Sequence, residues 1–217
     1  MKTIFIEARY KEKIFLPGEF IEKLPKEIAL FTIVQFIDSI NVIKKQLEKY
    51  NIKVKLLKTK HTKYPGQLLG CNIERFNAQN FLYIGDGMFH PKALLLKNNA
   101  RVFVYNPFTK KYFELTKKDV EDMLRKQKTG IVKFLSSKEI GVLVSTKQGQ
   151  NKLKEARKLR KKYPEKNFYF LVFNTIDFNE LENFPFIECF VNTACPRISY
   201  DDSEKIRKPI INIEEIQ

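Results

Sequence analysis

Cysteine and long hydrophobic runs are both scarce in this chain of 217 residues. Its three cysteines, Cys71, Cys189 and Cys195, are too few for the disulfide framework of a secreted domain, so they are thiols or metal ligands. No apolar run reaches the roughly 18 residues that span a membrane, and residues 1–14 alternate charged and apolar side chains, unlike the core of a signal peptide. The sequence therefore predicts a cytoplasmic protein that does not enter a membrane.

Arginine is also scarce, although the chain is strongly basic. Lys and Arg together number 40 against 25 Asp and Glu, a net charge of +15, yet only eight are Arg. The densest basic cluster, at 152–162, lies on a predicted helix whose apolar residues Leu153, Ala156 and Leu159 recur at three-residue spacing. A basic chain can attract nucleic acid. Lysines spread along the whole chain instead favour a solvated helix face or an acidic protein partner, and direct binding to nucleic acid is not expected.

An internal repeat divides the sequence into two similar halves. Residues 26–32 and 138–144 share a Lys-Glu-Ile start followed by apolar residues. In each half this predicted strand is followed by a helix, a second strand, a third strand and a short final strand. The predicted helices cover 36–50 and 149–163, and the later strands cover 52–57, 81–84 and 101–104 in the first half and 168–173, 189–192 and 208–211 in the second. With 43% apolar residues, the sequence predicts an α/β fold of two tandem units, each a small four-stranded, largely parallel sheet flanked by helices.

The boundary between the two units is predicted near residue 110. The first unit then spans residues 1–110, and the second spans residues 111–217 and includes a polar linking helix at 116–133. Residues 2–7 have the same basic-then-apolar character as the final strands, so we interpret them as the last strand of a further, missing unit. An ordinary N-terminal edge strand is the alternative.

Loops that follow the predicted strands carry residues suited to binding, because ligands of open parallel sheets lie beyond the carboxyl ends of the strands. The first such loop ends in Cys71, whose thiol is either within reach of a ligand or a small buried hydrophobe. In the second, Gly85 and Gly87 allow the backbone to approach a ligand, and His90 precedes a proline. This glycine spacing departs from the dinucleotide-binding fingerprint, and a generic turn is the alternative.

The third loop brings Cys195, Arg197 and Asp201 close together in the sequence. Arg197 can bind a carboxylate through two hydrogen bonds, and a Cys-Pro pair is typical of iron–sulfur ligation. The alternative is a strand-ending turn with a salt bridge. Cys189 lies within a predicted strand, which indicates packing in the core. If the two sheets face one another with the same ends inward, Cys71 and Cys195 converge, so the cysteine loops are predicted to meet at the interface.

A further polar loop follows the first strand of the second unit. There Ser145, Lys147 and Gln150 precede a predicted helix, an arrangement suited to binding an anion. Gln35 is the polar residue at the corresponding place in the first unit.

At these loops the sequence resembles the archaeal diphthamide synthase family, iron–sulfur enzymes named 2-(3-amino-3-carboxypropyl)histidine synthases. The resemblance covers essentially the whole chain, and its motifs lie at 64–71, 85–91, 106–109, 145–150 and 194–202. It implies three similar α/β units, each giving one cysteine to a central [4Fe–4S] cluster. The cluster cleaves S-adenosylmethionine to a 3-amino-3-carboxypropyl radical, which is added to a histidine of elongation factor 2.

The resemblance also implies roles for particular residues. Cys71 and Cys195 would be cluster ligands. Arg197 or Asp201 would contact the amino acid end of S-adenosylmethionine. The residues implied to line its pocket are Gln35, Gly85, Gly87, His90, Ser145, Lys147 and Gln150.

The chain departs from the family in one respect, because the family's first unit and its cysteine have no counterpart here. Two thiolates cannot hold three irons of a cluster. We therefore expect a partner polypeptide that carries the missing unit, pairing with a complete homologue, or loss of activity, and the intact cysteine loops favour the first. The family also suggests a homodimer or a heterodimer. Two other interpretations remain open: a non-catalytic, cluster-bearing or electron-delivering subunit, and a basic RNA-binding α/β protein whose cysteines only pack.

Overall fold

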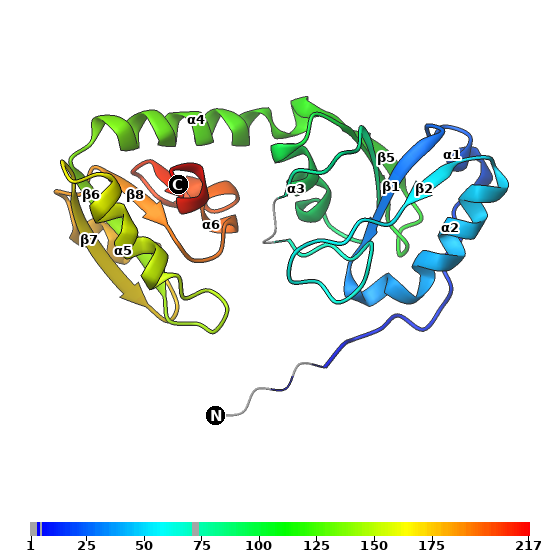
Figure 1. The fold of residues 1–217 in the computed structure, drawn as a ribbon, viewed down its shortest axis with the longest axis horizontal. Helices are drawn as coiled ribbons and strands as arrows, with labels where there is room; N and C mark the ends of the chain where they lie inside the picture. The colour runs from blue at the N-terminus through cyan, green and yellow to red at the C-terminus, as the bar shows by residue number, and fades with distance from the viewer. Residues whose placement is uncertain (1–3, 5, 71–73) are drawn as a thin grey trace. The chain divides into compact units, whose positions relative to one another are not determined.

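The computed structural model describes residues 4, 6–70 and 74–217. The chain divides into two compact units, Met1–Glu121 and Asp122–Gln217, each built on its own sheet (Figure 1). In the described part of the chain, no helix is long and apolar enough to cross a membrane.

The first unit contains a five-stranded sheet in the order β2-β1-β3-β4-β5. The first four strands are parallel and β5 is antiparallel to β4. The strands are β1 (Glu27–Thr32), β2 (Lys53–Lys55), β3 (Asn80–Ile84), β4 (Arg101–Tyr105) and β5 (Tyr112–Leu115). The helical segments are α1 (Gly18–Ile21), η1 (Val34–Ser39), α2 (Ile40–Lys49), α3 (Phe89–Lys97) and η2 (Lys117–Val120).

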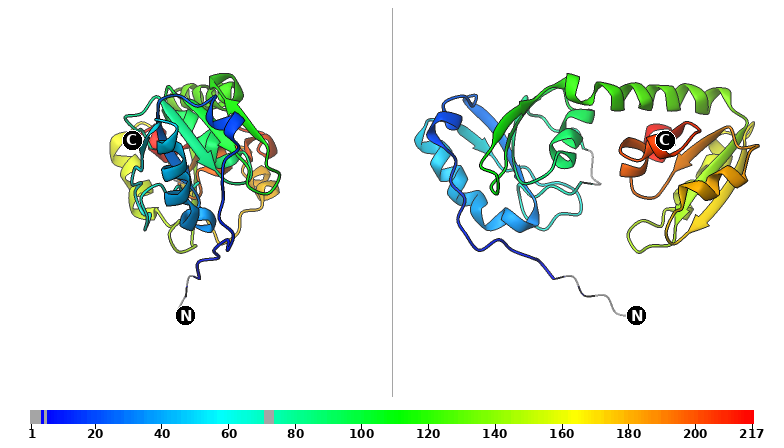
Figure 2. Two further views of the ribbon diagram at one scale, coloured as in Figure 1. Left: turned by 90° about the vertical axis from the view of Figure 1, so that its right-hand side faces the viewer. Right: turned by 180° about the vertical axis from the view of Figure 1, so that it is seen from behind.

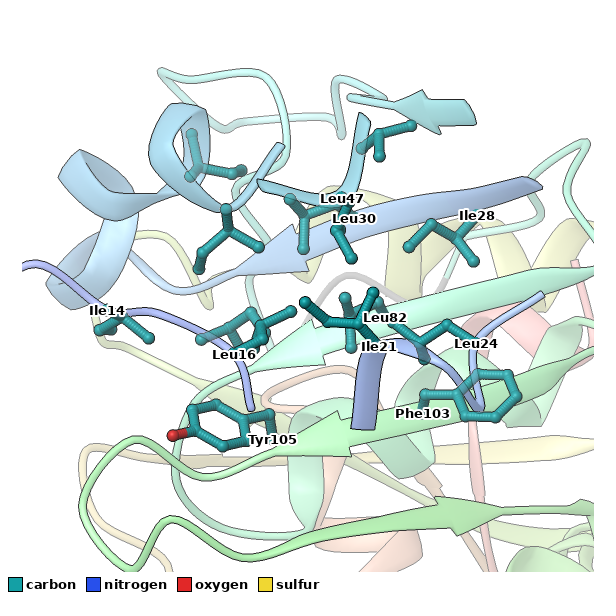
Figure 3. Packing of buried hydrophobic residues seen from close by; sticks show 14 of the residues in the cluster. Ile14, Leu16, Ile21, Leu24, Ile28, Leu30, Leu47, Leu82, Phe103 and Tyr105 are labelled. Carbon is teal, nitrogen blue, oxygen red and sulfur yellow. The ribbon is translucent and has the colours of Figure 1, made fainter. Parts of the chain in front are cut away.

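Helices α2 and α3 lie on opposite faces of this sheet (Figures 1 and 2). On the α2 face, Leu30 and Leu82 from neighbouring strands pack against Leu47 of the helix (Figure 3). The N-terminal segment is fixed to the same face because the Gln46 side chain bonds both backbone groups of Leu16, at 2.9 and 2.8 Å. With helices on both faces, β1 is buried along nearly its whole length, as expected for a central parallel strand.

The second unit contains a four-stranded parallel sheet in the order β7-β6-β8-β9. Its strands are β6 (Glu139–Ser145), β7 (Asn167–Phe173), β8 (Cys189–Asn192) and β9 (Ile210–Asn212). Its helical segments are α4 (Glu121–Ser136), α5 (Leu153–Lys162), η3 (Phe178–Asn183), α6 (Arg197–Tyr200), η4 (Ser203–Lys205) and η5 (Ile213–Glu215).

Helices α4 and α5 contribute to the same core cluster of this unit. Phe134 of α4 and Leu159 of α5 are buried together with Ile140 and Val191 of the sheet. Gly130 allows α4 to approach β9 closely, since a Cβ at this position would lie 2.9 Å from the carbonyl oxygen of Ile210. Any larger residue at position 130 would push the helix away from the sheet.

The predicted α/β fold of two sheet-containing units is confirmed, and the predicted parallel strands all occur. The first sheet differs by its fifth strand, β5, which returns antiparallel beside β4 through a turn that includes Lys110 at φ 57°. The predicted helix at 36–50 consists of two helical segments, η1 and α2, and the predicted helix at 149–163 begins later, with α5 at Leu153. Only in the second unit is the loop after the first strand longer than periodicity indicates, since η1 begins two residues after β1 ends.

Three predictions about organisation stay predictions. The first compact unit ends at Glu121 in the sequence. The predicted boundary lies near residue 110, before β5 and η2, which both belong to the first unit. Of the predicted strand at 2–7, residues 2, 3 and 5 lie outside the described residues, and residues 4, 6 and 7 have no regular secondary structure. The predicted meeting of the cysteine loops involves Cys71, which also lies outside the described residues.

Candidate functional site

The carboxyl edge of the first sheet is organised around the ends of β1 and β3. From β1 the chain crosses to β2 on one side and then to β3 on the other, which makes this edge a topological switch point, the usual ligand position in such sheets. The Thr32 hydroxyl donates to the Ile84 carbonyl at 2.7 Å and so joins the two strand ends. The loop before Cys71 continues this edge, because Leu68 N–H donates to Thr32 C=O at 2.7 Å.

Two glycines allow this loop to pack tightly. Gly66 has φ +76°, and a Cβ there would lie 2.2 Å from Ile40 Cδ1. A Cβ at Gly70 would lie 2.1 Å from the Phe89 ring and 3.1 Å from His90 Nε2. The loop that leads to Cys71 therefore runs against the start of α3, beside the predicted binding residue His90. Cys71 itself lies outside the described residues.

The turn after β3 is held by side-chain hydrogen bonds. Asp86 Oδ1 accepts from Gly87 N at 2.8 Å and from Asn106 Nδ2 at 2.7 Å, which ties the turn to the residue that follows β4. Gly87 has φ +73°, a conformation that favours glycine. The Gly87 N–H is bonded to Asp86, and the turn carries no side chain at position 87, where a Cβ would have nothing within 4 Å.

One face of the His90 ring packs against an aromatic ring. Its imidazole stacks on Tyr83, with ring centroids 5.8 Å apart and an interplanar angle of 11°. Burial raises the pKa of the Tyr83 hydroxyl, which therefore stays protonated. Gly85 is required here because a Cβ would lie 2.4 Å from that hydroxyl oxygen. Gln35 follows the neighbouring strand, and its backbone carbonyl accepts from Tyr10 N at 2.7 Å.

In the second unit, the loop after β6 is held mainly by its backbone. Ser145 Oγ is buried and accepts from Lys147 N at 3.1 Å, while Gln150 N donates to Lys147 C=O at 3.0 Å. The Lys147 side chain is exposed, and that of Gln150 is half-buried. The loop therefore presents the Lys147 ammonium group to solvent beyond the end of the central strand, β6.

The turn after β8 is fixed by a buried network of asparagines. Asn192 and Asn212 are 1% and 2% exposed and lie opposite one another in the β8–β9 register. Asn192 Nδ2 donates to Asn212 Oδ1 at 2.7 Å and to Cys195 C=O at 2.8 Å. The Ser199 hydroxyl also donates to Asn212 Oδ1, at 2.8 Å. Cys195 is partly exposed within this fixed turn.

Arg197 and Asp201 bind one another in the structure. Arg197 Nε lies 2.7 Å from Asp201 Oδ2, one turn further along, and both groups are on the surface. Their predicted contact with the amino acid end of S-adenosylmethionine stays a prediction.

Cys189 differs from Cys195 in every relevant property. It is fully buried in the core of β8, and its thiol lies 3.7 Å from the Phe190 carbonyl oxygen. Burial raises the pKa of the Cys189 thiol to about 12. Metal ligation needs a thiolate, so Cys189 is unsuited to it, and the interpretation as core packing agrees with the structure. A half-exposed cysteine on a fixed turn, as at Cys195, is suited to iron.

The described residues contain no group of three or more His, Cys, Asp or Glu side chains able to hold a metal ion. The structure assembles the predicted residues as two separate sets. Gln35, Gly85, Gly87 and His90 lie at the carboxyl edge of the first sheet, and Ser145, Lys147, Gln150, Cys195, Arg197 and Asp201 lie at that of the second.

Sequence reasoning missed the residues that support these turns. Asn192 and Asn212 hold the Cys195 turn, and Tyr83 supports His90. The sequence places each asparagine beside an apolar run: Asn192 ends the predicted strand at 189–192, and Asn212 directly follows the predicted strand at 208–211. Their pairing depends on the strand register, which the sequence alone does not show.

Comparisons with known proteins agree with the resemblance. The family model described as "Putative diphthamide synthesis protein" matches residues 1–217. The chain is 34% identical over 228 residues to the 2-(3-amino-3-carboxypropyl)histidine synthase of Pyrococcus horikoshii, covering 99% of this chain and 64% of that protein. It is 29% identical to the protein of the same name from Methanocaldococcus jannaschii, of which it covers 62%.

Solved structures give the same result. The crystal structure of Dph2 from Pyrococcus horikoshii with a 4Fe-4S cluster superposes with a TM-score of 0.78 at 34% identity, covering 92% of this chain and 58% of that one. The chain thus spans less than two thirds of the length of these relatives. By sequence and by fold, the chain belongs to the diphthamide synthesis protein family.

Proposed function

We propose that the chain takes part in transferring the 3-amino-3-carboxypropyl group from S-adenosylmethionine to a histidine of elongation factor 2, as the larger part of a [4Fe–4S] enzyme. The names of the relatives and the cluster in the Dph2 structure support the reaction. The observation that carries the proposal is the Cys195 turn, where a buried amide network holds a half-exposed thiol beyond the end of a central strand.

In this proposal Cys195 and Cys71 are two ligands of the cluster. When bound, the cluster supplies the electron that cleaves S-adenosylmethionine. Asn192 and Asn212 fix the backbone on which Cys195 lies, so that little conformational freedom is lost when iron binds. Cys189 remains a neutral core thiol.

The S-adenosylmethionine site is proposed at the two sets of loop residues. The turn at Gly85 and Gly87 exposes backbone beside His90, which Tyr83 keeps in one orientation. Lys147, exposed beyond β6, can pair with the carboxylate of the amino acid end. Arg197 can do so only by leaving or sharing its bond to Asp201.

A polypeptide that supplies a third cysteine is part of the proposal, because a cluster with one open iron needs three protein ligands and Cys71 and Cys195 are two of them. The third ligand would come from a chain that carries the unit without a counterpart here. A second copy of this chain would add only the same two cysteines, so a protein with a different cysteine loop completes the site better.

The test is anaerobic reconstitution of the full chain with iron and sulfide, alone and with a polypeptide that carries a homologous first unit. We expect stable [4Fe–4S] absorbance, bound iron and cleavage of S-adenosylmethionine only with the partner present. Cys195→Ser and Cys71→Ser should each abolish both iron retention and cleavage, and Cys189→Ser should abolish neither. Cluster assembly without cleavage would instead indicate the non-catalytic subunit.

A further inference from the structure

A cavity of about 340 Å³ lies within the second unit, between the first half of α4 and the segment that leads into β9. Ile210, which lines the cavity, is also the residue that α4 approaches closely at Gly130. Its volume lies near the lower end of small-molecule sites, which measure roughly 300–1,000 Å³. None of its lining residues belongs to the Cys195 turn.

The cavity is lined by four cations, Arg125, Lys126, Arg207 and Lys208, and by one carboxylate, Glu204. Glu204 is already paired with Lys126 at 2.8 Å. Lys208 Nζ donates to the carbonyls of residues 184 and 185, at 3.0 and 2.8 Å, which holds its ammonium group in place with a third N–H to spare. The lining therefore carries a surplus of positive charge.

Both guanidinium groups keep unused donors. Arg125 pairs with Asp122 at 2.8 Å and Arg207 with Glu182 at 3.4 Å, and neither acid lines the cavity. Each guanidinium has five N–H donors in a planar fork, so each can bind a second oxyanion beside its present partner. This geometry suits phosphate oxygens in particular.

A hydroxyl group at the cavity also lacks a partner. Ser203 Oγ is buried and makes no hydrogen bond to any described residue. A buried hydroxyl without a partner is unfavourable, and its hydrogen can turn toward any acceptor that comes within reach. A ligand oxygen would satisfy it.

The rest of the lining is apolar apart from Thr129. Ile206 and Ile210 are 7% and 6% exposed, and Pro209 lies between them in the sequence. Apolar side chains beside a cationic rim match a ligand with a flat ring at one end and negative charge at the other. A simple inorganic anion would leave the apolar part uncovered.

We propose that this cavity binds a nucleotide, with its phosphates on Arg125, Lys126, Arg207 and Lys208 and its base against Ile206 and Ile210. The site is independent of the proposed transferase function, because its residues do not take part in binding the cluster or S-adenosylmethionine.

Isothermal titration calorimetry of the full chain with ADP, AMP and pyrophosphate tests the proposal. We expect saturable binding of one ADP per chain, weaker binding of AMP and pyrophosphate, and a loss of affinity at high ionic strength. The double variant Arg125→Ala/Arg207→Ala removes two exposed guanidinium groups and should weaken ADP binding at least about tenfold. The matched control, Arg157→Ala/Lys161→Ala, removes equal charge from exposed positions on α5 and should change it less than about twofold.

Ser203→Ala separates ligand binding from a structural role. It should weaken ADP binding several-fold while leaving the melting temperature of the ligand-free chain unchanged or higher, since a group without a partner is removed. Three results would overturn the proposal: equal losses from the two double variants, pyrophosphate bound as tightly as ADP, or tight binding of a single-stranded RNA oligonucleotide without binding of ADP.

Discussion

The turns after β3 and β8 occupy equivalent places in the two units and are each held by a side-chain hydrogen bond, in different surroundings. In the first unit Asn106, directly after β4, donates to Asp86, and in the second Asn192 donates to Asn212 at the end of β9. The first unit uses Asp86 and Asn106, in contact with solvent, whereas the second uses Asn192 and Asn212, which are buried. Water can therefore replace this hydrogen bond in the first unit, whereas in the second unit the bond is buried and water cannot replace it.

This difference matters for what each turn carries. A solvent-exposed hydrogen bond is replaced by water when it breaks, so its net contribution is small. A buried amide that loses its partner has no water to replace it. The Cys195 turn is therefore held in one geometry, and the Gly85–Gly87 turn can adjust to a ligand.

The largest expected contrast is in the alkylation rates of two thiols, that of Cys189 at the start of β8 and that of Cys195 in the turn after this strand. At pH 8, a thiol with a pKa of about 12 has only about one part in ten thousand as thiolate. Iodoacetamide should therefore modify Cys195 at least about a hundredfold faster than Cys189, measured by mass spectrometry of the labelled peptides. The rate at Cys189 should rise as the pH approaches 12, because its reactive thiolate forms. Similar rates for both cysteines in the folded chain at pH 8 would contradict the burial of Cys189; the denatured chain is the control.

Asn212→Ala should have the next largest effect. It removes the acceptor of Asn192 and Ser199 and leaves Asn192 short of a partner in the core. We expect a loss of about 3 kcal/mol in the free energy of unfolding of the second unit, measured by urea denaturation followed by circular dichroism. A loss below about 1 kcal/mol would mean that water reaches this network.

The first unit offers a matched pair of glycines. Gly66 and Gly87 both have positive φ, but a Cβ at Gly66 meets Ile40 Cδ1 at 2.2 Å, whereas a Cβ at Gly87 has nothing within 4 Å. Gly66→Ala should cost about 2 kcal/mol more than Gly87→Ala, because crowding is added to backbone strain. Equal melting temperatures for the two variants would show that the loop before Cys71 yields easily.

The smallest effect is expected for Asn106→Ala, the counterpart of Asn212→Ala. Its bond to Asp86 is exposed, so the free energy of unfolding should fall by less than about 1 kcal/mol. A loss as large as that of Asn212→Ala would remove the distinction between the two turns.

Much of the fold could be predicted from the sequence because apolar runs and the internal repeat are local signals. The strand β5 is not predicted, because its four residues, Tyr112–Leu115, follow the motif at 106–109 closely and form an apolar pattern too short to distinguish. The cysteines and glycines of the site were identifiable from their loops. The asparagine network was not, because Asn192 and Asn212 meet only through the β8–β9 register.

The extra strand β5 also affects how the first unit behaves beside other extended chains. It covers the side of β4 that would otherwise be open, and the opposite edge strand, β2, has only three residues, with Lys53 and Lys55 at its ends. Short edge strands with lysines discourage edge-to-edge aggregation. The two edge strands, β2 and the four-residue β5, should therefore both be poor templates for pairing with another extended chain, although aromatic side chains such as Phe15 and Phe108 lie on the surface of this unit.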